Sequence, residues 1–381
     1  MVSLGVNVAV IDSGRILLTQ REDFEVWCLP GGETQSGESL AQAARREVRE
    51  ETGLEVDLTR LVGVYSRSAG AAGFGGHVAL FAARPTGGSL QGQPEEVVDL
   101  RFFAPDEVPA EMIAWHRRRI ADALDGVGGG VARWLQKTWP FQPGLTKQGL
   151  YALRDASGLT RREFYLRYMH APEEANVLEV PRDDGAEQFT PGEPGESQPR
   201  LAASVVVMQD GKLVLARHED FDVWCLPGGG VEAGETLAQA ARREVEEETG
   251  LQVKLTRLVG IYSEPQVFLR GIHIVQFAGY ASGGTLRARP GETAEVGYFA
   301  SDELPEHVQF GNRLRILDAL SGAGGGVAWM QRFGWPFAPE MTRKEIYALR
   351  DRSGLRRAEF YHQYFDSQAG DEYLEVGPGS T

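Results

Sequence analysis

The chain has 381 residues and a formal net charge of −15 at pH 7, and this length is enough for two or three domains that each bury a core. A chain this acidic has no general attraction for nucleic acid or for an anionic membrane surface, so nucleic acid is not an expected partner. No apolar run approaches membrane-spanning length and no signal-peptide pattern is recognised, so no membrane partner is expected either.

The two cysteines, Cys28 and Cys225, stand at matching places, each within the sequence Val-Trp-Cys-Leu-Pro. Cysteines at matching places of two separate domains are not expected to form a disulfide, and both fit the role of small core residues. We therefore expect a reduced, cytoplasmic protein.

Long-range self-similarity divides the chain into two repeats. Residues 4–14 align with residues 201–211, and residues 58–66 (LTRLVGVYS) align with residues 255–263 (LTRLVGIYS). The repeated unit is about 180 residues long, which indicates duplicated domains and not a solenoid. We expect an α/β domain at 1–125, a helical tail at 126–180, an unstructured Pro- and Gly-rich linker at 181–200, a second α/β domain at 201–321 and a second helical tail at 322–381.

Each repeat begins with the signal of a β-hairpin, in which two apolar runs flank a short polar turn that ends in Gly. Further strands are expected at residues 55–65, 77–83 and 100–103, and in the second repeat at 252–262, 273–280 and 296–299. A helix is expected after them, at residues 111–124 and 306–320. Strands and helices interleaved in this way predict a mixed β-sheet between helices.

The stretch between the hairpin and these strands predicts a helix that carries a cluster of carboxylates. Residues 236–249 are good helix formers with no internal Gly or Pro, and Thr236 and Gly250 are suited to cap the two ends. Glutamates three and four residues apart share one arc of this helix, where they repel one another unless a cation lies between them. Carboxylates without Cys or His favour a hard cation, Mg²⁺ or Mn²⁺. The glutamates are Glu244, Glu247 and Glu248, and in the first repeat Glu47, Glu50 and Glu51.

Residues 32–54 and residues 229–251 both resemble the Nudix box, G-x5-E-x7-R-E-U-x-E-E-x-G-U, in which U is a bulky aliphatic residue. All nine fixed positions are matched in each copy. The resemblance implies that each unit is a Nudix-type α/β/α sandwich with a mixed sheet, followed here by a small helical tail. It also implies a hydrolase of phosphoanhydride bonds, in which the metal neutralises phosphate charge and a carboxylate takes a proton from water.

The resemblance assigns metal and catalytic roles within the box. The implied principal metal ligands are Glu50, Glu51, Glu247 and Glu248. The residues implied as a further ligand or as the general base, a choice left open, are Glu47 and Glu244. The implied extra ligands are the carbonyl groups of Gly31 and Gly228.

Among the other box residues, the resemblance implies a place in the catalytic site for two arginines and structural roles for the rest. The arginines that orient carboxylates within the helix are Arg46 and Arg243. The glutamates that hold the loop to the helix are Glu38 and Glu235. The glycines that complete the box are Gly32, Gly53, Gly229 and Gly250.

Two carboxylates outside the box are further candidates for the catalytic site, because some Nudix members recruit an acid from another loop. They are Glu96 and Glu292, with Glu95 as a rival in the first copy and an ordinary loop acid as the alternative. The copies also differ in the loop before the helix, where the second has Gly230-Val231-Glu232 and the first has Glu33-Thr34-Gln35. Because Gly230 changes the backbone freedom where phosphate would lie, we expect the second site to be the more active.

Substrate choice depends on residues outside the box. Trp27 and Trp224 either stack on a base or fill the core, with the core favoured, and Arg21 and Arg217 are candidates to hold a phosphate. Pro265 lies close to the position of a proline found in Nudix members that hydrolyse ADP-ribose, and the first copy lacks it. We therefore expect a metal-dependent pyrophosphohydrolase for a nucleoside diphosphate linked to another moiety, with ADP-ribose or a nucleotide sugar favoured.

Two alternatives remain open at this stage. One is a nucleotide-sensing Nudix protein in which the tails bind a partner or DNA. The other is a chain with one active and one structural copy. Because both boxes keep all three helix glutamates, the hydrolase is the leading hypothesis.

Each tail contains aromatic residues followed by two short helices, whose starts are indicated by capping boxes at Thr160–Glu163 and Thr342–Glu345. We expect the helices to cover their own domain or the neighbouring one, with a helix-turn-helix DNA reader as the alternative. The aromatic residues form more apolar surface than a short hairpin can hide, so we expect them to be buried on a neighbouring domain. The two units would then pack as an intramolecular pseudo-dimer about an approximate twofold axis. The residues are Trp134, Trp139, Phe141, Trp329, Trp335 and Phe337.

Overall fold

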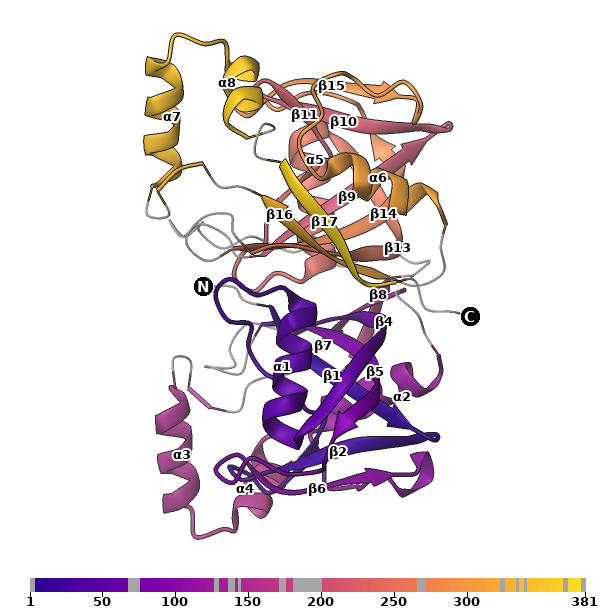
Figure 1. The fold of residues 1–381 in the computed structure, drawn as a ribbon, viewed down its shortest axis with the longest axis vertical. Coiled ribbons are helices and arrows are strands. Elements are labelled where there is room, and N and C mark those ends of the chain that lie inside the picture. Colours follow the sequence, from indigo (N-terminus) through magenta and orange to yellow (C-terminus); the bar gives the residue numbers. More distant parts are fainter. Residues whose placement is uncertain are drawn as a thin grey trace.

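The computed structural model contains two similar α/β units stacked along the long axis of the molecule (Figure 1). None of the helices it describes is both long and apolar enough to cross a membrane. The expected linker at 181–200 lies outside the described residues. These are residues 4–67, 76–126, 130–135, 141–142, 145–170, 176–180, 201–265, 271–322, 326–333, 336–338, 341–365 and 369–377.

The first unit is built on a sheet with strand order β3-β2-β1-β5-β4-β7-β8, to which β6 is added beside β2. Its elements are β1 (Leu4–Asp12), β2 (Arg15–Arg21), β3 (Trp27–Cys28), α1 (Leu40–Thr52), β4 (Leu54–Arg67), β5 (His77–Gly88), β6 (Val97–Phe103), η1 (Pro105–Glu107), α2 (Ala114–Leu124), β7 (Val131–Leu135), α3 (Lys147–Ala156), α4 (Arg161–Tyr168) and β8 (Asn176–Val180).

The second unit repeats this topology, with strand order β11-β10-β9-β14-β13-β16-β17; β12 pairs with β9 and β15 with β10. Its elements are β9 (Leu201–Gln209), β10 (Lys212–His218), β11 (Val223–Cys225), β12 (Gly228–Gly230), α5 (Leu237–Thr249), β13 (Leu251–Glu264), β14 (Ile272–Gly284), β15 (Thr293–Phe299), α6 (Asn312–Leu320), β16 (Val327–Phe333), α7 (Arg343–Arg352), α8 (Arg357–Tyr364) and β17 (Ala369–Val376).

Each sheet is mixed and covered on both faces. β1 runs parallel to β5, whereas β4 runs antiparallel to β5. The α1 side chains Leu40, Ala44 and Val48 belong to one hydrophobic core, and Ile120 and Ala123 of α2 belong to another. Strand β1 is therefore almost continuously apolar, as a strand buried on both faces requires. The predicted α/β/α sandwich is confirmed for both units.

The second predicted helix of each unit begins later than expected. Residues 111–113 are extended, because Trp27 pairs with Met112 and its carbonyl accepts a 2.8 Å hydrogen bond from the amide of Ile113. The helix therefore starts at Ala114, and α6 starts at Asn312 for the same reason. Residues 111–113 have a helix-like sequence, but pairing with Trp27, which is distant in the sequence, makes them extended.

The tails contain the two predicted helices and two strands that were not predicted. In the first tail, β7 runs parallel to β4, with Val131 opposite Gly63, and β8 closes that edge of the sheet. The second tail adds β16 and β17 beside β13 in the same way. The capping boxes at Thr160 and Thr342 are present as predicted.

Phe141, Trp329 and Phe337 pack on their own unit, so the expectation that they are buried on the neighbouring domain is wrong for these three residues. Phe164 of α4 stacks on Phe141 at 6.0 Å and on Phe24 at 6.4 Å between ring centroids. Phe24 lies in the loop after β2, and the second unit repeats this arrangement around Phe221. Trp139 and Trp335 lie outside the described residues.

Contacts between the two units are made instead by the sheet edges and the start of each box helix. Strand β17 contacts β4, and β8 contacts β13. The amide of Leu40 donates to Ser263 Oγ at 3.3 Å, and the amide of Leu237 donates to Ser66 Oγ at 3.3 Å. The same contact thus occurs twice with the roles of the units exchanged, as in a twofold interface.

Replacing Phe164 tests how the tail is attached. Because Phe164 is 2% exposed and lies between two other rings, we expect Phe164→Ala to lower the free energy of unfolding by about 3–5 kcal/mol. Leu153→Ala on the neighbouring helix α3 is the control, since Leu153 is 47% exposed and should cost about 0.5 kcal/mol or less. Chemical denaturation that gives equal values for both variants would contradict the docked tail.

Candidate active site in each Nudix box

The box helix of the second unit, α5, begins within one residue of its predicted start and ends at the predicted residue, and α1 of the first unit has the same capping pattern. Ser39 caps α1 and Thr236 caps α5, each in a reciprocal capping box with the glutamine three residues later. Gly53 and Gly250 end the helices in the left-handed conformation, with φ of 72° and 70°. Glycine adopts this conformation without the penalty that a Cβ would bring.

One arginine gathers the carboxylates of each box. In the second unit, Arg243 donates to Glu235 at 2.8 Å, to Glu244 at 2.7 Å and to Glu247 at 3.4 Å, and also to the carbonyl of Gly230 at 2.9 Å. Arg46 of the first unit makes the same set of bonds to Glu38, Glu47, Glu50 and the carbonyl of Glu33. These contacts agree with the orienting role that the resemblance implies for the two arginines.

The glutamate before each box helix ties the loop to that helix. Glu235 accepts a 3.0 Å hydrogen bond from the amide of Glu232, and Glu38 accepts one from the amide of Gln35. The glycines after Pro-Gly are required by close approach, because a Cβ on Gly229 would lie 2.6 Å from the carboxyl carbon of Glu244. Gly32 faces Glu47 in the same way.

The last glutamate of each box is buried and faces the glycine loop. Glu51 is 8% exposed and Glu248 is 2% exposed. Glu51 Oε2 accepts a 3.1 Å hydrogen bond from the amide of Gly31, and Glu248 accepts one of the same length from Gly228. The two glutamates thus contact the amide groups of Gly31 and Gly228. The resemblance had implied the carbonyl groups of the same two glycines as metal ligands.

Burial and crowding raise the pKa values of these carboxylates. Burial raises the pKa of Glu51 to about 8 and that of Glu244 to about 7. Burial, with the nearby charge of Glu244, raises the pKa of Glu248 well above its usual range. A bound cation would reverse this effect, because it favours the charged form of a carboxylate.

The donor set suits a hard divalent cation, but the side chains are turned toward protein partners. Among the described residues, no three His, Cys, Asp or Glu side chains form a group that could hold a metal as arranged. Glu47 and Glu244 face their arginines, and Glu51 and Glu248 face the glycine amides. Metal binding therefore requires rotation of these side chains while the helix stays in place.

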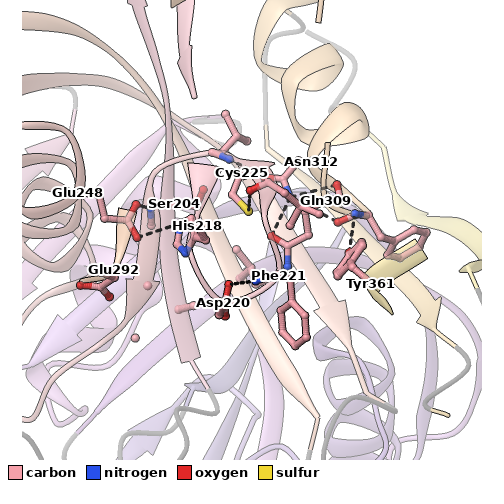
Figure 2. Close-up of a pocket in the computed structure, with 18 of the residues that line it drawn as sticks. Ser204, His218, Asp220, Phe221, Cys225, Glu248, Glu292, Gln309, Asn312 and Tyr361 are labelled. Carbon is pink, nitrogen blue, oxygen red and sulfur yellow. Dashed lines mark hydrogen bonds and ion pairs between the residues drawn. The ribbon is translucent and has the colours of Figure 1, made fainter. Parts of the chain in front are cut away.

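In the second unit the box opens into a cavity of about 630 Å³. Glu244, Glu248 and the β12 glycines line one end of it. The loop after β10 and helices α7 and α8 of the tail line another part, with Phe221, Tyr347 and Tyr361 among the lining residues. Figure 2 shows Glu248 and His218 on one side of this space and Asn312, Gln309 and Tyr361 on the other. The tail is therefore part of the wall of the candidate active site.

The two acids predicted outside the box lie within electrostatic reach of it. Glu292 lines the cavity and forms a 2.9 Å ion pair with Arg289, which also pairs with Glu247 at 2.9 Å. The charge of Glu96 helps to raise the pKa values of Glu47 and Glu51, after the larger effect of burial. Both acids thus remain candidates for the catalytic site.

The two tryptophans pack against aromatic rings of the same unit. Trp27 meets the edge of Phe103 at 4.9 Å, and Trp224 meets Phe299 at 4.8 Å between ring centroids. Trp27 is buried and belongs to a hydrophobic core. This packing favours the core role, which the sequence analysis had ranked above base stacking.

The two arginines proposed to hold phosphate are not equivalent and already have acidic partners. Arg21 pairs with Asp23 at 2.6 Å, and Arg217 pairs with Glu295 at 2.9 Å. Arg21 is the last residue of β2, and the equivalent last residue of β10 in the second unit is His218. His218 Nε2 lies 3.3 Å from Glu248 Oε1, and burial lowers the pKa of this imidazole.

Sequence reasoning missed the residues that attach each tail beside the site. The hydroxyl of Tyr347 donates to Asp220 Oδ2 at 3.0 Å, and Arg350 donates to the carbonyl of Asp220. Tyr151, Arg154 and Asp23 repeat this arrangement in the first unit. A signal was available, because Tyr-Ala-Leu-Arg-Asp and Glu-Asp-Phe each occur once in both repeats.

Comparison with known proteins identifies the class of the chain. The NUDIX domain model matches residues 1–124 and residues 198–319. The chain therefore belongs to the NUDIX family, a class of hydrolases that act on phosphoanhydride bonds, and it carries two copies of the domain. This confirms the resemblance seen in the two boxes.

Individual relatives match about one unit at a time. A MutT-like protein of Streptomyces ambofaciens is 41% identical over 122 residues, which are 32% of this chain and 77% of that protein. An ADP-ribose pyrophosphatase of Methanocaldococcus jannaschii is 37% identical over 132 residues, 33% of this chain and 76% of that protein. The crystal structure of an ADP-ribose pyrophosphatase from Streptococcus suis is 26% identical and covers 33% of this chain and 92% of that one, with a TM-score of 0.29.

Proposed function

We propose that the chain is a divalent-metal-dependent pyrophosphohydrolase that cleaves a nucleoside diphosphate linked to another moiety, with ADP-ribose or a nucleotide sugar favoured. The observation that carries this proposal is the cavity of the second unit, in which the box carboxylates and the tail line one space. Its volume of about 630 Å³ is within the range of pockets that hold small-molecule ligands. A relative named ADP-ribose pyrophosphatase supports the substrate class.

The proposed chemistry assigns a task to each group of residues. When bound, Mg²⁺ or Mn²⁺ would neutralise phosphate charge and make a coordinated water more acidic. Glu247 and Glu248, with Glu50 and Glu51 in the first unit, would hold the cation, and one of the box glutamates would accept the proton of the attacking water. Arg243 would keep Glu244 and Glu247 on the same side of the helix through the bonds described above.

The tail of the second unit would supply recognition of the substrate. Arg343, the first residue of α7, lines the cavity and has no hydrogen-bond or ion-pair partner among the described residues. Its positive charge adds to the lowering of the His218 pKa that burial causes, and it opposes the rise that burial causes in the pKa of Tyr347. The guanidinium therefore lies near both side chains. An unpaired guanidinium at the wall of a phosphohydrolase site is suited to bind a phosphate group.

The two units would act as an intramolecular pseudo-dimer. The reciprocal bonds of Leu40 with Ser263 and of Leu237 with Ser66 support this arrangement. So does one hydrophobic cluster that includes residues of β1 and α1 together with residues of β9 and α5. A short covalent linker between the units would replace the dimerisation of separate chains.

Substituting the last glutamate of each box tests the number of working sites. Burial raises the pKa of Glu51 to about 8 and raises that of Glu248 well above its usual range, so burial disfavours the charged form of both side chains. Glutamine has nearly the same shape and no charge, and it should leave the fold intact. We expect Glu51→Gln or Glu248→Gln alone to leave part of the Mg²⁺-dependent hydrolysis and the double variant to abolish it. EDTA should suppress the unmodified protein to the same level.

Two outcomes would contradict this proposal in different ways. Complete loss with Glu248→Gln alone would mean that the first copy is structural. An unchanged rate in the double variant, or after chelation, would argue against hydrolysis at these carboxylates and in favour of the nucleotide-sensing alternative. Circular dichroism spectra that match the unmodified chain are the control for folding.

Arg343→Gln tests recognition by the tail. We introduce it with Glu51→Gln, so that only the second site turns over, and expect KM to rise about tenfold, the effect of losing a hydrogen bond to a charged group, with kcat little changed. Lys344→Gln is the matched control, because Lys344 is the next residue on α7 and does not line the cavity. Equal KM values for the two variants would contradict a substrate contact at Arg343.

Small-angle X-ray scattering tests the pseudo-dimer. Units joined through the sheet edges and box helices should give the distance distribution of one compact particle. The measurement uses the full chain at several dilutions, which separates this internal packing from association between chains. Two separated lobes in the distribution would rule out the packed arrangement.

A further inference from the structure

The start of each box helix is completed by the other unit. An α-helix leaves its first amide groups without partners inside the helix. In α1, Ser39 accepts a 3.1 Å hydrogen bond from the amide of Gln42, but the amide of Leu40 donates to Ser263 of the second unit at 3.3 Å. In α5 the corresponding donation from Leu237 goes to Ser66 of the first unit, also at 3.3 Å.

Each accepting serine is held in place by its own sheet. Ser66 Oγ lies 2.9 Å from His77 Nδ1, and Ser263 Oγ lies 3.0 Å from His273 Nδ1. Each pair faces across neighbouring strands, β4 with β5 and β13 with β14, so the strand register fixes the hydroxyl. All four side chains are buried. The hydroxyl is thus a fixed acceptor for a helix of the other unit.

A carboxylate from the other unit makes a second contact at the same helix end. Glu179 of β8 accepts a 2.8 Å hydrogen bond from the hydroxyl of Thr236, the cap of α5. Glu375 of β17 is hydrogen-bonded to Ser39, the cap of α1, and its backbone carbonyl accepts a bond from Arg45 at 3.3 Å. Negative charge at a helix N-terminus is stabilising, because it opposes the positive end of the helix dipole.

This helix end is connected directly to the carboxylate cluster. Glu38 precedes the cap Ser39, and its carboxylate holds Arg46, which in turn holds Glu47 at 2.7 Å. A shift of the helix start therefore moves the glutamate that positions the arginine. Glu235, Arg243 and Glu244 form the same chain of contacts in the second unit.

We infer that each unit supplies positioning residues for the active site of the other: Ser66 and Glu179 for the second box, and Ser263 and Glu375 for the first. None of these four residues lines the cavity of the second unit, and they would act by fixing the start of the box helix. The functional part of this inference rests on the proposed hydrolase activity. The structural part, which helix each serine caps, does not depend on it.

Hydrogen exchange in the full chain tests which helix each serine caps. Ser263→Ala should speed amide exchange at the start of α1, where its partner Leu40 lies, and leave the start of α5 unchanged. Ser66→Ala is the matched variant and should do the reverse. The two helix peptides can be told apart by mass, because one contains Ser39 and the other Thr236. Faster exchange in the variant's own unit, or equal change in both, would overturn the inference.

The activity test uses one working site at a time. In the Glu248→Gln background, only the first unit turns over, and Ser263→Ala in the silent second unit should lower kcat about fivefold, if the stability that a helix-start hydrogen bond contributes is lost from the positioned state. Ser66→Ala in the working unit should leave kcat unchanged. In the Glu51→Gln background, where only the second unit turns over, Ser66→Ala should lower kcat and Ser263→Ala should leave it unchanged. General destabilisation would lower both, so that outcome also counts against positioning.

A second variant keeps the test decisive if Ser263→Ala reduces the folded fraction. Glu375→Gln removes the charge at the same helix end without changing side-chain volume, and it should speed exchange at α1 alone. If the Glu51→Gln, Glu248→Gln double variant keeps its hydrolysis rate, the proposed function fails, while the exchange pattern still decides the capping. Exchange at α1 that is unchanged in both Ser263→Ala and Glu375→Gln would overturn the inference.

Discussion

The charge balance around one arginine in each box governs the architecture of the site. Arg243 holds Glu235, which precedes helix α5, together with Glu244 and Glu247 of that helix, and without it these three carboxylates would lose their shared cation. The glycine at 229 follows from this arrangement, since a Cβ there would meet Glu244. The same arginine also holds the carbonyl of Gly230, so the loop and the helix share one anchor. A metal would take over part of the charge balance that the arginine provides.

The sequence predicted the box helix of the second unit to within a residue and missed the features formed at long range. Ser39 and Thr236 cap their helices through contacts three residues away, and Gly53 and Gly250 act through their own backbone, so local residues contain this information. The pairing of β7 with β4 depends instead on chain closure across about seventy residues, which local patterns do not record. The tail contacts of Asp220 and the cross-unit bond of Ser66 are missed for the same reason.

The two candidate sites keep the same carboxylates in different surroundings. The amide of Leu29 donates to the imidazole of His116, whereas the equivalent amide of Leu226 donates to the carboxamide of Asn312. The equivalent backbone amide is thus bound by a different side chain in each unit, and in the second unit that side chain, Asn312, lines the cavity. At the end of the second strand, a guanidinium in one unit is replaced by an imidazole beside the last box glutamate in the other. Duplication has therefore retained the box while its neighbours have diverged.

The tail makes each repeat longer than a Nudix box requires. Its residues contact both the candidate site of their own unit and the box helix of the other unit. Its helices α7 and α8 line the cavity of their own unit, through Tyr347 and Tyr361 among others. In the first tail, the strand that follows the two helices carries Glu179, which reaches the cap of the other unit's box helix. Helix α4 ends at Tyr168 and strand β8 begins at Asn176, so the two elements are close in the sequence. Aromatic contacts with Phe24, in the loop after β2, hold the helices against their own unit. In the proposed function, the same addition to the fold would serve substrate recognition at one site and support of the other site.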